Sequence, residues 1–327
     1  MSSHSQGASV PLVNIDNAIT GPLKGGSHEP TFAGVASFMR RRLTKDLSEA
    51  DVAVWGVPFD CATSNRPGAR FGPAAIRRAS AIFDGDPQYP SGLDPFAHLA
   101  VIDCGDCLFE YERIAQAPAQ IEQQARQILD AGVHLISLGG DHFVTLPLLR
   151  AHHGGHGAAG GPLALVQFDA HQDTWDDDGS KISHGTFATR AVAEGLIDPA
   201  RSIQIGVRTI APQDHGIEVL TMEQCEALGA GGMAARIRQR VGPGPAYLSF
   251  DIDALDPAFA PGTGTPVAGG LTSREALSVL WRLGEVDWRG MDVVEVSPAY
   301  DHSDMTAIVA ATVVQHYIQL LAMRRGG

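Results

Sequence analysis

Apolar residues along this chain fall into short continuous runs that alternate with stretches of helical spacing. The runs predict β-strands at residues 51–57, 99–103, 133–138, 163–168, 202–207, 246–250 and 291–296. Between them, apolar spacing and Gly or Pro boundaries predict helices at 72–79, 121–129, 143–151, 186–195, 273–283 and 306–323. In the second of these helices, for example, apolar side chains recur on one face at Ile121, Ala125, Ile128 and Leu129.

This alternation defines the expected fold class, which is α/β. Near-continuous apolar strands separated by helices are typical of a mostly parallel sheet that helices cover on both faces. The chain shows neither a repeat of fixed period nor a linker, so we expect a single domain over 46–327. Residues 1–45 are interpreted as an N-terminal arm, because Pro and Gly interrupt any regular pattern there. The basic run 40–42 within the arm is expected to be a solvated helix end.

Ionisable side chains follow the predicted strands at the point where each strand ends. The strand 163–168 leads into three such residues within five positions, and alternate residues of an extended chain point to one side. In open α/β sheets, functional sites lie at the carboxyl ends of the strands. The residues in this position are His142, Asp169, His171, Asp173, Asp251, Asp253 and Glu295.

Several carboxylates at one place indicate a metal centre. Burying neighbouring carboxylates costs several kcal/mol unless positive charge lies between them. Four Asp and two His are too rich in oxygen for one structural zinc, which prefers Cys and His. The set suits two divalent cations that share bridging carboxylates. Oxygen ligands with a minority of imidazole favour manganese, with iron or cobalt as possible substitutes.

Charge and cysteine content narrow the class of protein. The 327 residues carry a formal net charge of −13, which argues against nucleic acid as the main partner. Four scattered cysteines are too few for a disulfide scaffold, and the spacing of Cys104 and Cys107 is interpreted as two plain reduced thiols. No secretory signal is visible and no apolar run approaches the ~20 residues of a membrane span. We therefore expect a cytoplasmic protein without a membrane partner. The histidine-containing stretch 152–157 is interpreted as a glycine-rich surface loop.

Three stretches carry a resemblance to a known family. Residues 139–142 (GGDH), 169–173 (DAHQD) and 249–257 (SFDIDALDP), the last continuing through 258–266, resemble the three signature blocks of the ureohydrolases, the arginase and agmatinase family. The similarity runs from about residue 50 to the C-terminus. Residues 61–64, 143–150 and 295–301 resemble the agmatinase branch most. The resemblance implies a three-layer αβα fold around a mainly parallel eight-stranded sheet, and a homo-trimer or homo-hexamer.

The resemblance also implies two Mn²⁺ ions per subunit and assigns their ligands. The first ion would be held by His142, Asp169, Asp173 and Asp251. The second would be held by Asp169, His171, Asp251 and Asp253, so that Asp169 and Asp251 bridge the pair. All six positions hold the residue type that the family pattern requires.

The expected reaction is hydrolysis of agmatine to putrescine and urea. Two metal ions about 3.5–4 Å apart lower the pKa of a shared water, and the resulting hydroxide attacks the guanidinium carbon. Asp173 is a plausible carrier of the proton to the leaving amine. The resemblance implies that Glu295 binds the guanidinium group of the substrate, since a carboxylate can accept two parallel N–H bonds. It gives His184 the role of proton shuttle or substrate contact, for which an imidazole titrates in the right range.

The substrate's far end is expected to meet the loop 174–183. This loop holds Asp176, Asp177 and Asp178, which would attract the cationic tail of agmatine. A carboxylate tail would need Lys181 or Arg190 to turn inward, which keeps guanidinobutyrase as the alternative activity. An alternative of another class is a catalytically silent metal-binding relative, which the complete set of ligands disfavours.

Overall fold

The computed structural model describes residues 16–27, 29–83, 87–154 and 161–326. Within these ranges eight strands form one parallel sheet in the order β2-β1-β3-β8-β7-β4-β5-β6. Their bounds are β1 Val52–Val57, β2 Val101–Asp106, β3 His134–Gly139, β4 Ala164–Phe168, β5 Ile203–Val207, β6 Glu218–Thr221, β7 Pro245–Asp251 and β8 Asp287–Val294. The expected α/β class and eight-stranded parallel sheet are confirmed.

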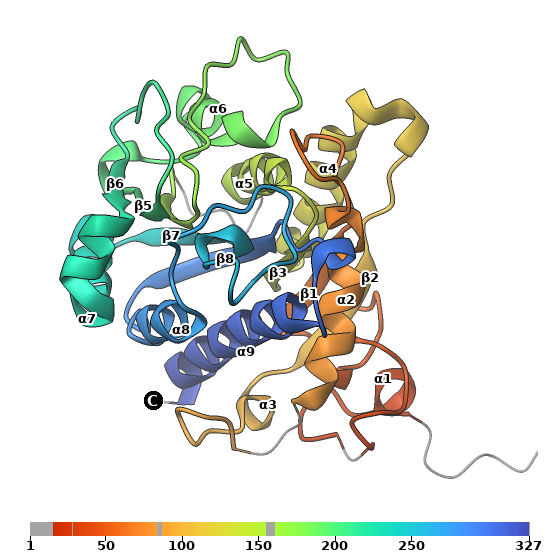
Figure 1. The fold of residues 1–327 in the computed structure, drawn as a ribbon. Helices are drawn as coiled ribbons and strands as arrows, with labels where there is room; N and C mark the ends of the chain where they lie inside the picture. The colour runs from red at the N-terminus through yellow and green to blue at the C-terminus, as the bar shows by residue number, and fades with distance from the viewer. Residues whose placement is uncertain (1–15, 28, 84–86, 155–160, 327) are drawn as a thin grey trace, which may run out of the picture.

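Helices cover both faces of this sheet (Figure 1). Alternate strand residues such as Val52, Val54 and Ile136 pack with α2 Gly72–Ala79, α7 Met222–Val241, α8 Ser273–Trp281 and α9 Met305–Gly326 in one apolar core. The other core joins Ala53, Trp55 and Leu135 to α4 Ala117–Asp130, α5 Thr145–Gly154 and α6 Phe187–Ala193. Two short helices, α1 Asn17–Thr20 and α3 Pro95–His98, complete the set. The period-two alternation of β-strands thus supplies both cores of a three-layer αβα fold.

The sequence pattern does not predict the short helices α1 and α3, nor two further elements near residue 230, and strand β8 ends earlier than expected. The apolar pattern predicts no element between residues 208 and 245, where β6 and the 20-residue helix α7 lie. Three glycines dilute the apolar pattern of α7, and Gly229 adopts φ 60° inside it. Strand β8 ends at Val294, so Glu295 follows the strand instead of belonging to it.

The described residues of the arm, within 16–45, pack on the domain. The expectation that the basic run 40–42 is solvated is wrong for two of its three residues. Arg40 and Arg41 are each 1% exposed. Arg41 lies with its guanidinium carbon 4.0 Å from the centre of the Phe96 ring and donates to the carbonyl of Gly25 at 2.7 Å. Arg40 donates to the carbonyls of Glu29 and Ala81. Carbonyl oxygens from distant segments replace the water that a charge run normally keeps.

The interpretation of residues 152–157 as a surface loop is wrong for His152. His152 and His153 belong to the last turn of α5, and His152 is buried with its Nδ1 2.9 Å from the carbonyl of Leu148. Residues 155–157 lie outside the described residues. Cys104 and Cys107 are free and buried, in agreement with the expected plain thiols.

Helix α9 is a long apolar helix, and we compare it with the expectation that no apolar run approaches the length of a membrane span. By length and composition Met305–Arg325 would suffice to cross a membrane, so that expectation is wrong for this stretch. However, 72% of its most apolar window is buried inside the protein. This is the burial of a core helix, as the sequence predicts for residues 306–323.

Candidate active site

The strand order explains why residues far apart in sequence meet. The four neighbouring strands β3, β8, β7 and β4 end at Gly139, Val294, Asp251 and Phe168. Directly after or at these ends come His142, Glu295, Asp251 with Asp253, and Asp169 with His171 and Asp173. Parallel strands end at the same edge, so the side chains gather at the centre of the sheet's carboxyl edge.

Two groups of carboxylates each surround one imidazole. Nδ1 of His142 lies 2.9 Å from Asp169 Oδ2, 3.0 Å from Asp173 Oδ2 and 3.1 Å from Asp251 Oδ2. Nδ1 of His171 lies 3.3 Å from Asp169 Oδ1 and 3.1 Å from Asp253 Oδ2. Asp169 therefore turns one oxygen toward each imidazole, which is the arrangement that a bridging carboxylate requires. The structure brings all six expected ligands together.

The electrostatics of this cluster call for added positive charge. Burial opposes a charge on His142, but the three carboxylates beside it outweigh burial and raise its pKa well above the ordinary value. Burial and the negative Asp253 and Asp169 raise the pKa of Asp251 well above its usual range. Burial, with Asp169 nearby, likewise raises the pKa of Asp173 to about 6. Buried carboxylates that resist ionisation side by side fit a site whose charge a pair of divalent cations would balance.

Glu295 and His184 form a second unit beside the cluster. Glu295 Oε1 accepts the backbone N–H of His142 at 2.9 Å and lies 2.9 Å from His184 Nδ1. The other oxygen, Oε2, is buried and has no hydrogen-bond partner among the described residues. Glu295 and Asp173 both adopt left-handed backbone, with φ 63° and 52°. Non-glycine residues adopt this conformation at an energetic cost and do so preferentially at functional sites.

Ser64 holds the outer nitrogen of His184. Its backbone N–H donates to His184 Nε2 at 3.1 Å, and its hydroxyl lies 2.8 Å from the same atom. The hydroxyl can donate to a neutral imidazole or accept from a protonated one, whereas the backbone N–H can donate to Nε2 only while that nitrogen carries no hydrogen. Burial opposes the charge on His184, but Glu295, Asp173 and Asp141 raise its pKa to about 9. His184 is thus able to carry a proton at neutral pH.

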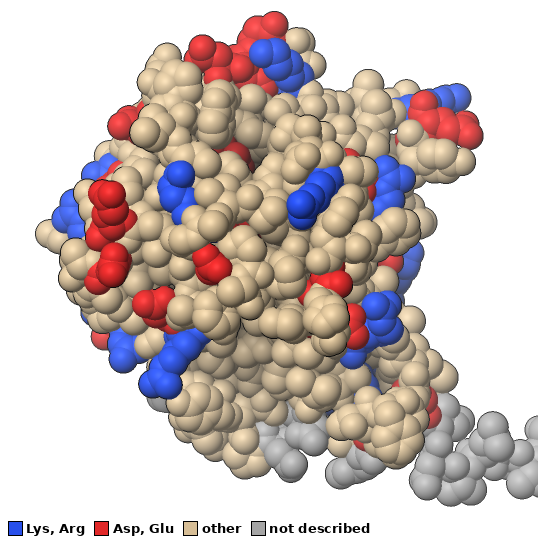
Figure 2. Space-filling model, viewed as in Figure 1, with Lys and Arg blue, Asp and Glu red and all other residues tan. Residues whose placement is uncertain are grey.

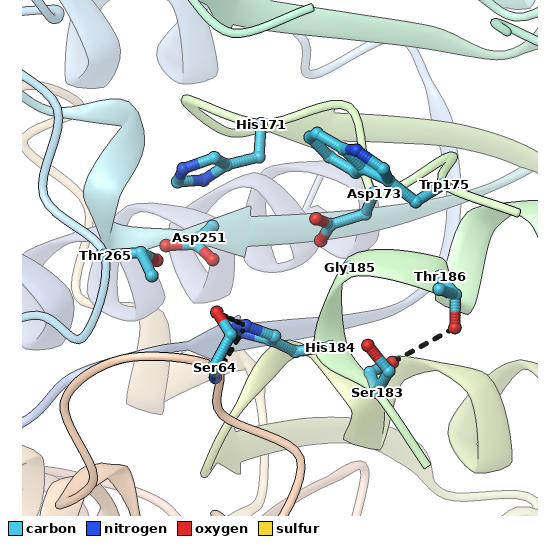
Figure 3. A pocket seen from close by; sticks show the side chains of 10 residues that line it. All are labelled: Ser64, His171, Asp173, Trp175, Ser183, His184, Gly185, Thr186, Asp251 and Thr265. Carbon is cyan, nitrogen blue, oxygen red and sulfur yellow. Dashed lines mark hydrogen bonds between the residues drawn. The ribbon is translucent and has the colours of Figure 1, made fainter. Parts of the chain in front are cut away.

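A pocket of about 290 Å³ opens above these groups. Figure 3 shows Asp173 and Asp251 between His171 and Trp175 on one side and Ser64 and His184 on the other. The residues that line it are Ser64, His171, Asp173, Trp175, Ser183, His184, Gly185, Thr186, Asp251 and Thr265. Glu295 is not among them and lies behind His184. Sequence reasoning assigns no role to Ser64, Trp175 or Thr265, although Ser64 and Thr265 lie in stretches that carry the resemblance.

The three Asp of the neighbouring loop do not line the pocket. Asp176 and Asp178 are exposed, and Asp178 accepts from the backbone and hydroxyl of Ser180. Asp177 accepts at 2.6 Å from the hydroxyl of Thr186, which does line the pocket. Figure 2 shows acidic side chains gathered at the top of the molecule, over the loop that precedes α6 in Figure 1. The loop therefore contributes negative charge near the mouth and reaches the lining through Thr186.

Comparisons with known proteins place this fold and site in a class. The model of the Arginase family matches residues 50–319. The agmatinase of Chromobacterium violaceum is 47% identical over 304 residues, which cover 93% of this chain and 94% of that protein. A crystal structure of a hypothetical agmatinase from Burkholderia thailandensis superposes with a TM-score of 0.93, at 50% identity over 95% of this chain and 99% of that chain.

A third protein shows the breadth of the class. Proclavaminate amidino hydrolase from Streptomyces clavuligerus gives a TM-score of 0.82 at 40% identity, over 90% of this chain and 99% of that chain. These matches show that the chain belongs to the arginase family. The parallel sheet and the carboxylate cluster at its central edge agree with this assignment. The resemblance seen in the sequence is confirmed.

Proposed function

We propose that this chain is an agmatinase, which hydrolyses agmatine to putrescine and urea. The observation that carries the proposal is the composition of the pocket. Among the described residues that line it there is no Lys or Arg, while Asp173, Asp251 and the indole of Trp175 all face it. Agmatine is positively charged at both ends. Asp173 and Asp251 are also expected metal ligands, and four carboxylates roughly cancel two divalent cations, so the pocket would stay near neutral with metal bound. Such a pocket suits a dication, because no Lys or Arg of its lining repels positive charge and the indole face of Trp175 attracts it.

Two Mn²⁺ ions are the cofactor that the six donors fit. His142, Asp169, Asp173 and Asp251 would hold one ion, and Asp169, His171, Asp251 and Asp253 the other. Mixed imidazole and carboxylate donors are compatible with manganese, with iron and cobalt as substitutes. The chemistry supplied by a bound pair of such ions is activation of a water for attack on a carbon centre.

The chain's own residues provide orientation and proton transfer. Glu295 stays our candidate for the guanidinium contact although it lies outside the pocket lining, because its Oε2 is a buried acceptor without a donor among the described residues. His184 lies against Glu295 and opens onto the pocket, so it is placed to deliver a proton to the departing amine. Asp173 also lines the pocket and could carry the proton from the attacking water. The loop residues Asp176, Asp177 and Asp178 would attract the cationic tail.

Guanidinobutyrase is the alternative activity. It would need Lys181 or Arg190 to bind the carboxylate tail of its substrate, and both side chains have other partners. Lys181 Nζ donates to the carbonyl of Asp176, and Arg190 donates to the carbonyl of Lys181 and pairs with Glu194. Neither residue lines the pocket. A carboxylate tail would therefore meet negative charge without a compensating cation. A catalytically silent relative is disfavoured because all six donors are present and converge.

The deciding experiment is urea release from purified, Mn-loaded protein with agmatine and 4-guanidinobutyrate at equal concentrations. We expect agmatine to be strongly preferred. Preference for 4-guanidinobutyrate would keep the metal chemistry and refute the proposed substrate, and it would direct mutagenesis to Lys181 and Arg190. Failure to release urea from either compound would favour the silent relative. The homo-trimer or homo-hexamer and the cytoplasmic location stay predictions, the first open to light scattering.

A further inference from the structure

A chain of buried polar groups lies behind His142, on the side away from the carboxylates. His142 Nε2 is 2.8 Å from the hydroxyl of Ser249, and that hydroxyl donates at 2.7 Å to Asp292 Oδ1. Ser249 on β7 and Asp292 on β8 are register partners in the sheet. Ser249 and Asp292 are 0% exposed. Burying a carboxylate within a strand costs free energy unless hydrogen bonds replace those it makes to water.

The hydrogen atoms available in this chain determine its direction. Asp292 Oδ2 accepts from the hydroxyls of Tyr247 and Thr145, each at 2.9 Å, so the carboxylate receives three O–H donors in all. Ser249 has a single hydroxyl hydrogen, and it goes to Asp292. The hydroxyl can then only accept from His142, so Nε2 must carry a hydrogen. Nδ1 is left as the nitrogen that faces Asp169, Asp173 and Asp251 with its lone pair available to a cation.

We propose that Asp292, acting through Ser249, is a positioning group that fixes the tautomer and ring orientation of His142 as a metal ligand. This inference rests on the metal centre of the proposed function. Metal-binding histidines characteristically give their other N–H to a carboxylate, a carbonyl or a water, and removing that partner lowers metal affinity about 10- to 100-fold. Here Ser249 extends the reach of the carboxylate by one hydroxyl. No comparable partner of His171 was found among the described residues.

The variant Asp292→Asn tests the direction of the hydrogen bonds. An amide N–H pointed at Ser249 would free the serine hydrogen to donate to Nε2, which would move the imidazole hydrogen to Nδ1 and block that ligand. We expect Mn²⁺ affinity at one of the two sites to fall about 10- to 100-fold, with the other site changed little. The free Mn²⁺ concentration can be followed by electron paramagnetic resonance during titration of the full chain after chelation.

Two further variants separate positioning from simple structural support. Ser249→Ala removes the acceptor of Nε2 and should lower the same affinity, which provides a second test if Asp292→Asn folds poorly. Thr145→Val removes a hydroxyl that donates to the other oxygen of Asp292 and lies 3.3 Å from the Ser249 hydroxyl. The shorter hydrogen bonds from His142 to Ser249 and from Ser249 to Asp292 stay in place, so this variant should bind Mn²⁺ like the parent protein. Thermal unfolding of each metal-free variant reports whether the fold is kept.

The outcomes distinguish this inference from the proposed function. Wild-type Mn²⁺ affinity at both sites in folded Asp292→Asn and Ser249→Ala would overturn the positioning role. An equal loss in Thr145→Val would also overturn it, because general disruption of the cluster would then suffice. If the parent chain binds two Mn²⁺ and Asp292→Asn loses one, the inference stands even when agmatine is not hydrolysed, and only the proposed substrate fails.

Discussion

The inner end of the site and its mouth differ in burial and in the elements that hold their residues. At the inner end His142, Asp251 and Asp253 are at most 2% exposed, and they lie at or just after the ends of β3 and β7, the two strands that flank β8. At the mouth the His171 side chain is 19% exposed, and Trp175 and the three Asp belong to the loop that connects β4 to α6. Strand ends fix positions within the packed sheet, whereas loops vary at little cost to the fold. We therefore expect metal binding to depend most on the groups held at the strand ends, and selectivity between substrates to depend on loop residues such as Trp175.

The largest effect is expected at the inner end, from Asp169→Asn. Asp169 is the carboxylate that faces both imidazoles, so its loss should disturb both metal positions. Loss of a direct ligand should exceed the ~100-fold reduction in metal affinity that follows loss of an outer partner. Metal content after dialysis and urea release at saturating agmatine measure it. The exposed Asp46→Asn, just after the N-terminal arm and outside the site, is the control. An Asp169→Asn protein that keeps two ions would show that the cluster is not the metal centre.

A smaller loss of turnover rate, caused by slower proton transfer, is expected from His184→Asn. The pKa of His184 is raised to about 9, so the imidazole is protonated below that pH and loses its proton above it. If it donates to the leaving amine, turnover of the parent enzyme should decline as pH rises through about 9. The variant should lack this decline and be slower by about 10²- to 10⁴-fold at neutral pH.

Rates measured from pH 7 to 10 test this expectation. The exposed His153→Asn on α5 is the matched control and should leave the profile unchanged. An alkaline decline that persists in His184→Asn would assign it to another group.

At the mouth, Trp175→Leu should change selectivity more than chemistry. Attraction between an ammonium group and an indole face is worth about 0.5–2 kcal/mol, or roughly 2- to 30-fold in KM. We expect KM for agmatine to rise by that factor while kcat changes little, and Trp175→Phe to lie between the two. The same measurements with butylguanidine, which lacks the second charge, give the contribution of simple apolar contact. An equal rise for both substrates would remove the indole from charge recognition.

The smallest effect is expected from the triple variant Asp176→Asn, Asp177→Asn and Asp178→Asn. Exposed charges contribute about 0–1 kcal/mol each at most and are screened by salt. The rate at low agmatine should fall a few-fold at low ionic strength, and the difference should vanish near 0.5 M salt. Glu223→Gln with Glu226→Gln on α7 is the control for a general change of charge. An unchanged rate at low substrate would reduce the loop to a solvated turn.

The sequence predicts the inner end of the site much better than the mouth. An apolar run that ends in ionisable residues is a local signal, and it singles out the six candidate donors and Glu295, while the resemblance supplies their expected roles. Ser64 and Trp175 meet His184 and the pocket only through the folding of loops, and no local pattern gives either residue a role, although Ser64 lies in a stretch that carries the resemblance. Asp292 lies within an apolar strand and its role is not visible there, because its partners Ser249 and Tyr247 lie more than 40 residues away.

The same contrast explains which parts of the fold the sequence pattern does not predict. Strands are predicted wherever apolar residues run continuously. Helix α7 is not predicted because Gly229, Gly231 and Gly232 interrupt its pattern, and the packing of Met233 and Ile237 against the sheet compensates for them. The burial of Arg40 and Arg41 depends on carbonyls from Gly25, Glu29 and Ala81, which a run of three charges does not reveal.

The place of β8 has a consequence for how the chain matures as it is synthesised. This strand is the last in sequence, yet it lies between β3 and β7 in the middle of the sheet. Until it leaves the ribosome, the nascent chain can form only two separate half-sheets, β2-β1-β3 and β7-β4-β5-β6, each with an open inner edge. Chains lengthen by about 5–20 residues per second, so those edges stay unpaired for seconds in every round of translation. Insertion of β8 joins the halves and brings Glu295 beside His142 and Asp292 beside Ser249 in the same step, so we expect that a chain without β8 cannot assemble the site.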